Sequence, residues 1–254
     1  MSPSFDKFVE FQQLLVANVE KNRQCLGLMF AGSAANLSRV DEHSDQDFFL
    51  IVSDGLAEQF RLDLTWLPNS QDILLSPRET EHGLKVLYRD GMLLEFAVFE
   101  ESELASHMAP QDNRVAFDRK NISEVIAEIS KKSQPRKFEP LDEYQLFLTL
   151  IQIGAGRVMR GEVIAGSQHI KSYAVNALLG LIRHFEPVAD PHLDSLDRFR
   201  RFEMDYPELG ARISDLLESP SLKCAVGLLE VSDRLPVSDT FAEARNQIMA
   251  TLMR

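Results

Sequence analysis

The chain carries LGLMFAGS at residues 26–33 and, after eleven intervening residues, DQDFFLIV at residues 45–52. Short apolar runs bounded by turn residues are typical of buried strands, so we predict strands at 26–30 and from Asp45 onwards. Side chains alternate between the two faces of a strand, which places Asp45 and Asp47 on the same face. Two carboxylates on one face offer the oxygen ligands that Mg²⁺ prefers, so this stretch predicts a site for a hard cation.

Gly32 and Ser33 end the first run. Glycine favours a tight turn and serine a helix N-cap, so we expect a helix at about 34–39. Its entry would point backbone N–H groups at an anion such as a phosphate. A second interpretation stays open, because Gly-Ser turns are common and an Asp-x-Asp pair is also found at solvated strand ends and helix caps.

Gly32, Ser33, Asp45 and Asp47 together resemble the signature of the nucleotidyltransferase superfamily, which includes DNA polymerase beta and the antibiotic nucleotidyltransferases. That signature is Gly-Ser, a linker of about this length, and Asp-x-Asp at the start of a strand. Gln46 departs from it, since the family usually has an apolar residue there. We expect the amide of Gln46 to lie against the fold, away from the two carboxylates.

The resemblance implies a fold and a reaction. In layout the chain is most similar to the aminoglycoside and lincosamide adenylyltransferases: an α/β (α+β) nucleotidyltransferase domain with a small mixed sheet at residues 1–134, then an all-α helical bundle at 135–254 that binds the acceptor. The implied reaction moves a nucleoside monophosphate, AMP from ATP, to a hydroxyl of a small, antibiotic-like molecule. Mg²⁺ is the implied metal, with the NTP as co-substrate. The alternative is a catalytically degenerate nucleotide-binding or antitoxin-type interaction module.

Glu95 is the candidate third acid. It lies at residues 92–99, the second arm of a hairpin predicted from the Asp90-Gly91 turn. Apolar neighbours on both sides predict that the run is buried, where an unpaired carboxylate is costly and needs a partner. That partner is a metal ion or substrate, or else an arginine such as Arg39 or Arg61. In the resembled enzymes an acid on this strand is a metal ligand or the general base, and both roles stay open for Glu95.

Further strands and helices are predicted on either side of this hairpin. Asp118 ends a predicted strand, either as an acid of the site or as a cap for the next helix. Trp66 is expected to pack against the core. The predicted elements are strands at 72–76 and 115–118 and helices at 56–67 and 123–132.

The composition changes at residues 131–140, which contain two prolines and no apolar periodicity, so a linker is predicted there. Helical patterns separated by proline or glycine follow it and predict a bundle of four to six helices. The expected helices are 141–161, 167–185, 193–202, 207–217, 221–231 and 238–253.

Charged residues gather around the first connection between these helices. A solvated corner is the default interpretation of such a group. The resemblance implies that a basic side chain of this half reaches the triphosphate, and Lys171 is the candidate. Glu143 and Glu162 are acids that would meet a cationic acceptor or serve as base.

The 254 residues carry a formal net charge of −12, with a pI near 5.0. Nucleic-acid binding relies on Lys and Arg, so this balance argues against a nucleic-acid partner and favours a small acceptor. Cys25 and Cys224 lack metal-site spacing and are expected to be buried thiols in a reducing compartment. Residues 1–23 lack a signal-peptide pattern, and no apolar stretch is long enough to span a bilayer. We therefore expect a cytoplasmic protein that has no membrane partner. A homodimer is compatible with the sequence.

Overall fold

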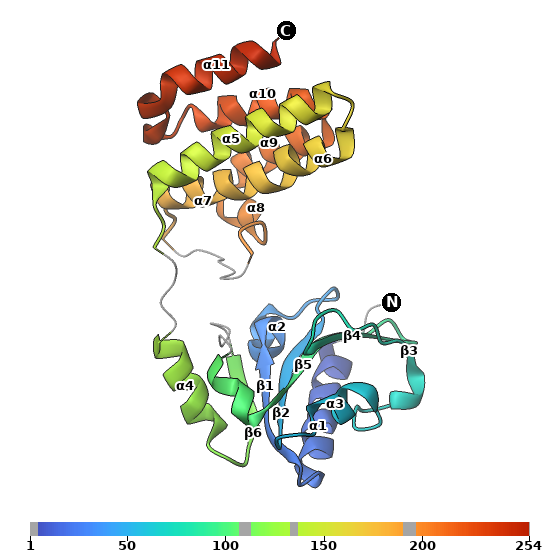
Figure 1. Ribbon diagram of the computed structural model, residues 1–254. Coiled ribbons are helices and arrows are strands. Elements are labelled where there is room, and N and C mark those ends of the chain that lie inside the picture. Colours follow the sequence, from blue (N-terminus) through green and yellow to red (C-terminus); the bar gives the residue numbers. More distant parts are fainter. Residues whose placement is uncertain (1–4, 107–112, 133–136, 190–196, 254) are drawn as a thin grey trace. The chain divides into compact units, whose positions relative to one another are not determined.

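The computed structural model describes residues 5–106, 113–132, 137–189 and 197–253 (Figure 1). The chain divides into two compact units, Met1–Pro135 and Arg136–Arg254. The first unit combines a mixed sheet with helices, and the second unit is helical in its described residues, as the sequence predicts. Part of the predicted linker, residues 133–136, lies outside the described residues.

A six-stranded sheet forms the centre of the first unit, with the strand order β3-β4-β5-β2-β1-β6. β2 runs parallel to β5, and every other neighbouring pair is antiparallel, so the sheet is mixed as expected. The strands are β1 (Cys25–Ala31), β2 (Gln46–Val52), β3 (Ile73–Leu75), β4 (Gly83–Tyr88), β5 (Leu93–Glu100) and β6 (Asn113–Asp118).

The two faces of this sheet are covered differently. Helix α1 (Phe5–Lys21) packs its apolar side against one face, where Phe48 and Leu50 of β2 lie in the same buried cluster as α1. On the other face Ile51 packs with α4 (Ile122–Lys132). Asp47 has the same strand parity as Ile51. Asp47 therefore points to the same face of the sheet as Ile51, and α4 covers that face only near Ile51.

The helix expected at 34–39 is instead two short turns. α2 (Gly32–Ala35) follows β1 directly, and the 3-10 turn η1 (Leu37–Arg39) follows α2. Asn36 separates them, because its side-chain oxygen accepts the backbone N–H of Ser38 at 3.2 Å. Asparagine side chains compete in this way with the helical ladder, which explains the break. Ser33 is therefore inside α2 and is not its N-cap.

The helix expected at 56–67 is also shorter, since α3 spans only Ala57–Leu62. The carboxylate of Asp63 accepts the N–H of Thr65 at 3.0 Å and turns the chain away from the helix. Trp66 packs against aromatic side chains of the core, and its indole N–H donates to the carbonyl of Phe60 at 3.0 Å. The packing role expected for Trp66 is confirmed.

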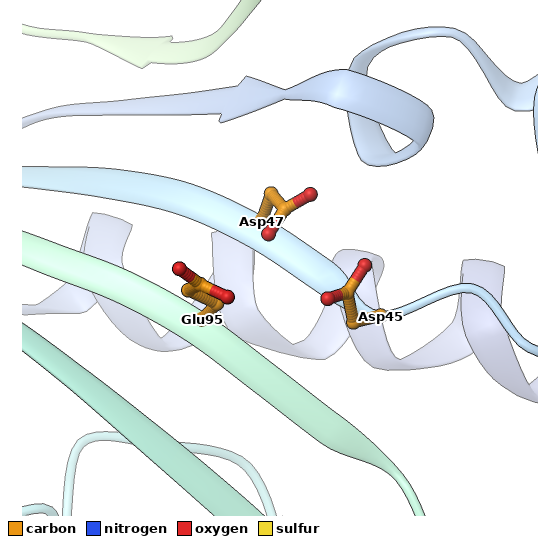
Figure 2. Close-up of side chains that lie close together, drawn as sticks. All are labelled: Asp45, Asp47 and Glu95. Atoms are coloured by element: carbon orange, nitrogen blue, oxygen red, sulfur yellow. The ribbon is translucent and has the colours of Figure 1, made fainter. Parts of the chain in front are cut away.

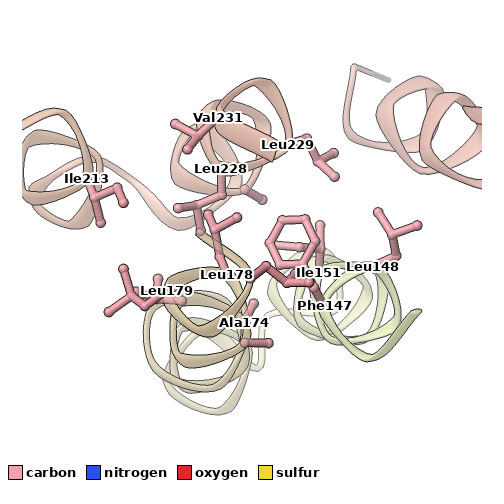
Figure 3. Packing of buried hydrophobic residues seen from close by; sticks show 14 of the residues in the cluster. Phe147, Leu148, Ile151, Ala174, Leu178, Leu179, Ile213, Leu228, Leu229 and Val231 are labelled. Carbon is pink, nitrogen blue, oxygen red and sulfur yellow. The ribbon is translucent and has the colours of Figure 1, made fainter. Parts of the chain in front are cut away.

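The second unit is a bundle with one apolar core. Figure 3 shows side chains of α5, α7, α9 and α10 meeting there, among them Ile151, Leu178 and Leu228. No helix among the described residues is long and apolar enough to cross a membrane. The elements are α5 (Pro140–Met159), α6 (Val163–Gln168), the π-helical η4 (His169–Ala174), α7 (Val175–Phe185), α8 (Phe202–Asp205), α9 (Pro207–Glu218), α10 (Ser221–Ser232), the 3-10 turn η5 (Pro236–Phe241) and α11 (Ala242–Leu252).

The helix expected at 193–202 is wrong in its described part. Residues 193–196 lie outside the described residues, and 197–201 are not helical. Arg201 has a positive φ of 61°, which an α-helix does not accommodate, so α8 begins only at Phe202. Asp197 accepts the N–H of Phe199 at 2.9 Å, a local turn that replaces the first helical bond.

Candidate metal centre

Three carboxylates come together at one end of the sheet, two from neighbouring positions of the chain and one from a distant strand. Each of Asp45, Asp47 and Glu95 offers an oxygen, and these oxygens all lie within 4.8 Å of one another. Figure 2 shows Asp47 and Glu95 on neighbouring strands and Asp45 directly before the strand that carries Asp47. The register explains the meeting, because Asp47 lies opposite Glu95 in the parallel pair of β2 and β5. No second group of this kind occurs among the described residues.

The Gly32–Ser33 turn lies beside this cluster. Gly32 has a φ of +54°, and a Cβ at this position would lie 3.0 Å from Oδ2 of Asp47. Only glycine adopts this conformation without strain and lets the backbone come so close to the carboxylate. The turn predicted to bind an anion thus lies next to the acids predicted to bind a cation.

Glu95 is half-exposed rather than buried, so the expectation of a buried acid is wrong. Its side chain is 46% exposed and pairs with Nζ of Lys85 at 3.4 Å. The neighbours Leu94 and Phe96 face the covered side of the sheet, which leaves Glu95 on the open side. Arg61, one of the expected partners, donates instead to the carbonyl of Val98.

Lys85 is the residue that sequence reasoning missed. Its ammonium lies 3.0 Å from Glu79 as well as 3.4 Å from Glu95. The hydrogen bond that Lys85 donates to Glu79, with the nearby charge of Glu95, raises the pKa of Lys85 above its usual range. The hairpin register could have found this pair, since β4 and β5 place Lys85 directly opposite Glu95.

The three acids repel one another when all of them are charged and no cation lies between them. At separations near 4.8 Å, two unit charges repel by about 1 kcal/mol in water and by about 3 kcal/mol at an effective dielectric constant of 20. A divalent cation among the three would convert this repulsion into attraction. The role of Asp45, Asp47 and Glu95 as metal ligands stays a prediction.

Gln46 points to the opposite side of β2. It is completely buried, and its amide donates to the carbonyl of Phe8 at 2.8 Å. The expectation that this amide lies against the fold is confirmed. Asp118 also takes one of its two expected roles, because its carboxylate accepts the N–H groups of Ile122 at 2.8 Å and Ser123 at 3.0 Å and so caps α4.

The candidates of the helical unit have local partners there. Nζ of Lys171 donates to the carbonyls of Leu217 at 2.7 Å and Ser219 at 2.6 Å, at the C-terminal end of α9. A cation satisfies free carbonyls at such a position. A triphosphate contact by Lys171 stays a prediction.

The two acids of that unit are paired with arginines. Glu143 forms an ion pair with Arg198, and Glu162 forms one with Arg160 at 3.3 Å. Their predicted roles at the acceptor stay predictions.

Cys25 and Cys224 are free and buried. Burial raises the pKa of Cys25 to about 12 and that of Cys224 to about 11. Thiols with such pKa values are neutral and unreactive near pH 7. The expectation of buried thiols is confirmed.

No family model and no curated protein matches the sequence. Among solved structures, the chain is similar to a nucleotidyltransferase-like protein from Exiguobacterium sibiricum 255-15, with 12% identity, a TM-score of 0.37, and coverage of 96% of this chain and 79% of that one. It is also similar to an aminoglycoside 6-adenyltransferase from Bacillus subtilis, with 12% identity, a TM-score of 0.34, and coverage of 96% and 91%. A third is the CdnC:HORMA-deltaN complex of E. coli MS115-1, with 12% identity, a TM-score of 0.30, and coverage of 99% and 93%.

The solved structures similar to this chain thus include the kinds of protein that the sequence resembles. At 12% identity and with TM-scores below 0.5, similarity of shape assigns no reaction to this chain.

Proposed function

We propose that this chain is a metal-dependent nucleotidyltransferase that moves AMP from ATP to a hydroxyl group of a small molecule. One observation carries the proposal: the convergence of Asp45, Asp47 and Glu95 within 4.8 Å, beside the Gly32–Ser33 turn. Cation ligands and backbone donors for an anion are both needed to hold a nucleoside triphosphate with its metal, and here they are neighbours.

The three acids fit Mg²⁺ or Mn²⁺. All three donors are carboxylate oxygens, which these hard cations prefer over nitrogen or sulfur. Oxygens bound to one octahedral Mg²⁺ lie about 3–4 Å apart, so groups already within 4.8 Å need only small rotations to share an ion. The half-exposed position of Glu95 leaves room for substrate phosphates in the remaining coordination positions.

The residues then divide the work of the reaction. A bound metal ion would supply charge neutralisation and orientation of the phosphates. Backbone N–H groups of Gly32 and Ser33 donate to the β- and γ-phosphates and hold the leaving group in place. The acceptor oxygen bonds to the α-phosphorus, the bond from that phosphorus to the bridging oxygen breaks, and pyrophosphate leaves. Positioning of these groups supplies much of the rate.

Glu95 receives one of two roles in this scheme. As general base, its carboxylate oxygen accepts the proton of the acceptor hydroxyl. As third ligand, it adds a negative charge to the metal site and the proton leaves to water or phosphate. In either role Glu95 keeps the ammonium of Lys85 as a neighbour, 3.4 Å away.

The acceptor is proposed to be small. A net charge of −12 disfavours a polyanionic nucleic acid and suits a neutral or cationic compound such as an aminoglycoside. We propose that the helical unit contributes acceptor contacts. Glu143 and Glu162, which pair with Arg198 and Arg160, are the acids proposed to meet a cationic group. Antibiotic modification is one physiology that fits this chemistry.

An assay with α-labelled nucleoside triphosphates tests the proposal. The protein is incubated with each NTP, Mg²⁺ or Mn²⁺, and pools of small hydroxyl compounds that include aminoglycosides. We expect the label to move to one acceptor class with stoichiometric release of pyrophosphate, and the Asp47→Asn variant to release none. NTP binding without turnover in any pool would favour the degenerate binding module, and absence of both metal and NTP binding would refute the proposal.

A further inference from the structure

A buried chain of amides lies behind the metal centre, on the face of the sheet that α1 covers. Gln46 is completely buried and Gln12 of α1 is 5% exposed. Nε2 of Gln12 donates both to the carbonyl of Ala34 at 3.0 Å and to Oε1 of Gln46 at 3.1 Å. Nε2 of Gln46 donates in turn to the carbonyl of Phe8 at 2.8 Å. Both amide nitrogens and Oε1 of Gln46 therefore have partners within this chain.

Arg114 of β6 extends this chain. Its Nη2 donates to Oε1 of Gln12 at 2.8 Å and to the carbonyl of Ala34 at 3.3 Å. The guanidinium also lies over the ring of Phe30, 4.8 Å from its centroid. Arg114 as a whole is exposed, while burial of its guanidinium lowers its pKa. Four segments that are far apart in sequence are thus joined by one network.

The network joins the two halves of the metal and phosphate site through their immediate chain neighbours. Gln46 lies between Asp45 and Asp47, and Ala34 directly follows Ser33. A single amide group, that of Gln12, bonds to both. We propose, on the basis of the function proposed above, that Gln12 and Gln46 are positioning residues that fix the phosphate turn relative to the two aspartates.

The energetics favour a positioning role over simple core filling. Neighbouring positions on this face, such as Phe48 and Leu50, are apolar and fully buried, so an apolar residue at position 46 would extend the core. Burying an amide gains nothing over a hydrocarbon of the same shape unless its bonds are needed. Those bonds are directional, and they specify one arrangement of the turn and the strand where apolar packing tolerates several. Residues that orient metal ligands from behind change metal affinity by about 10–100-fold.

Methionine substitutions test this inference, because methionine has nearly the shape of glutamine without its hydrogen bonds. The variants Gln46→Met, Gln12→Met and the double variant are compared with wild type for Mn²⁺ affinity without nucleotide, measured by electron paramagnetic resonance, and for melting temperature. We expect each single variant to bind Mn²⁺ about tenfold more weakly and to melt at lower temperature, since one buried amide loses a partner. In the double variant no amide is left without its partner, so part of the lost melting temperature should recover, although the carbonyls of Phe8 and Ala34 each lose a donor. Mn²⁺ affinity should stay about tenfold weaker than that of wild type.

Tyr88→Phe is the matched control. It removes a buried hydrogen bond of the same unit, from the hydroxyl of Tyr88 to the carbonyl of Pro68 at 2.8 Å. It should lower the melting temperature and leave Mn²⁺ affinity unchanged.

Two results separate this inference from the proposed function. If Asp47→Asn abolishes Mn²⁺ binding while the double variant binds as wild type does, the network only stabilises the fold and the inference is overturned. If Asp47→Asn itself leaves Mn²⁺ affinity unchanged, the three acids are not a metal site and the proposed function fails with it.

Discussion

Without metal, the Asp45→Asn variant should be more stable than wild type, and with metal it should be less stable. Asp45 has two carboxylate neighbours within 4.8 Å and is partly exposed. In the metal-free protein the amide removes two repulsive interactions, so the variant should unfold at a higher temperature. In Mn²⁺ the wild type should be the more stable protein, because the variant has lost an anionic ligand.

The size of both effects follows from the geometry. Two unit charges 4.8 Å apart repel by about 0.9 kcal/mol at the dielectric constant of water, the appropriate limit for a partly exposed cluster. Relief of two such pairs gives about 1–2 kcal/mol, or about 3–8 °C in melting temperature for a unit of this size. Mn²⁺ at one hundred times its dissociation constant should stabilise the wild type by about 2.7 kcal/mol, and the variant by much less.

Thermal melts followed by circular dichroism, with EDTA and with Mn²⁺, measure this reversal. Glu42→Gln is the matched control, since Glu42 is an exposed acid of the same connection that pairs with His43 and is not part of the cluster. It should behave as wild type does in both buffers. Equal Mn²⁺-induced shifts for wild type and Asp45→Asn, or a lower metal-free melting temperature for the variant, would refute the electrostatic account of the cluster.

Three further results are expected. Glu95→Gln should lower turnover by a factor of about 10² or more, because the amide cannot accept a proton. Its metal-free melting temperature should hold or rise, because the amide relieves repulsion from the two aspartates, and a large fall in melting temperature would count against this role. Lys85→Met should tighten Mn²⁺ binding roughly two- to fivefold in calorimetry, because it removes a cation 3.4 Å from Glu95, and weaker binding would show that Lys85 supports the site. Cys25 and Cys224 should resist thiol reagents at pH 8 until the protein unfolds. Because burial raises their pKa values from 9.0 to about 12 and about 11, the two thiols contribute fully to stability below pH 9, and this contribution declines above it. Denaturant unfolding at pH 8 and at pH 10 measures the change, and a higher stability at pH 10 would contradict it.

Local patterns were sufficient to predict the sheet around the site. The Asp90-Gly91 turn is one example, since Gly91 has a φ of +90° and the N–H of Tyr88 donates to the carbonyl of Met92 at 2.9 Å across the hairpin. The spacing of Asp45 and Asp47 likewise predicted two acids on one face. Signals of this kind are contained within a few residues, where turn chemistry and strand alternation act directly.

Features that depend on tertiary packing could not be predicted in this way. Glu95 has apolar neighbours in both strand phases, and only the packing of α1 against Leu94 and Phe96 decides which face stays open. Gln12 and Arg114 gave no signal in the sequence, because Gln12 contacts Gln46 at a sequence separation of 34 and Arg114 contacts Ala34 at a separation of 80. Helix periodicity also predicted too long a helix at 56–67, because a turn at Asp63 ends α3.

The most direct test of the central claim is a crystal structure with Mn²⁺ and a non-hydrolysable ATP analogue, using anomalous scattering to locate the metal. We expect an anomalous peak bound by Asp45, Asp47 and the analogue's phosphates, with the β- and γ-phosphates at the Gly32–Ser33 turn. A metal peak elsewhere, or a nucleotide bound away from that turn with the three acids still solvated, would contradict it.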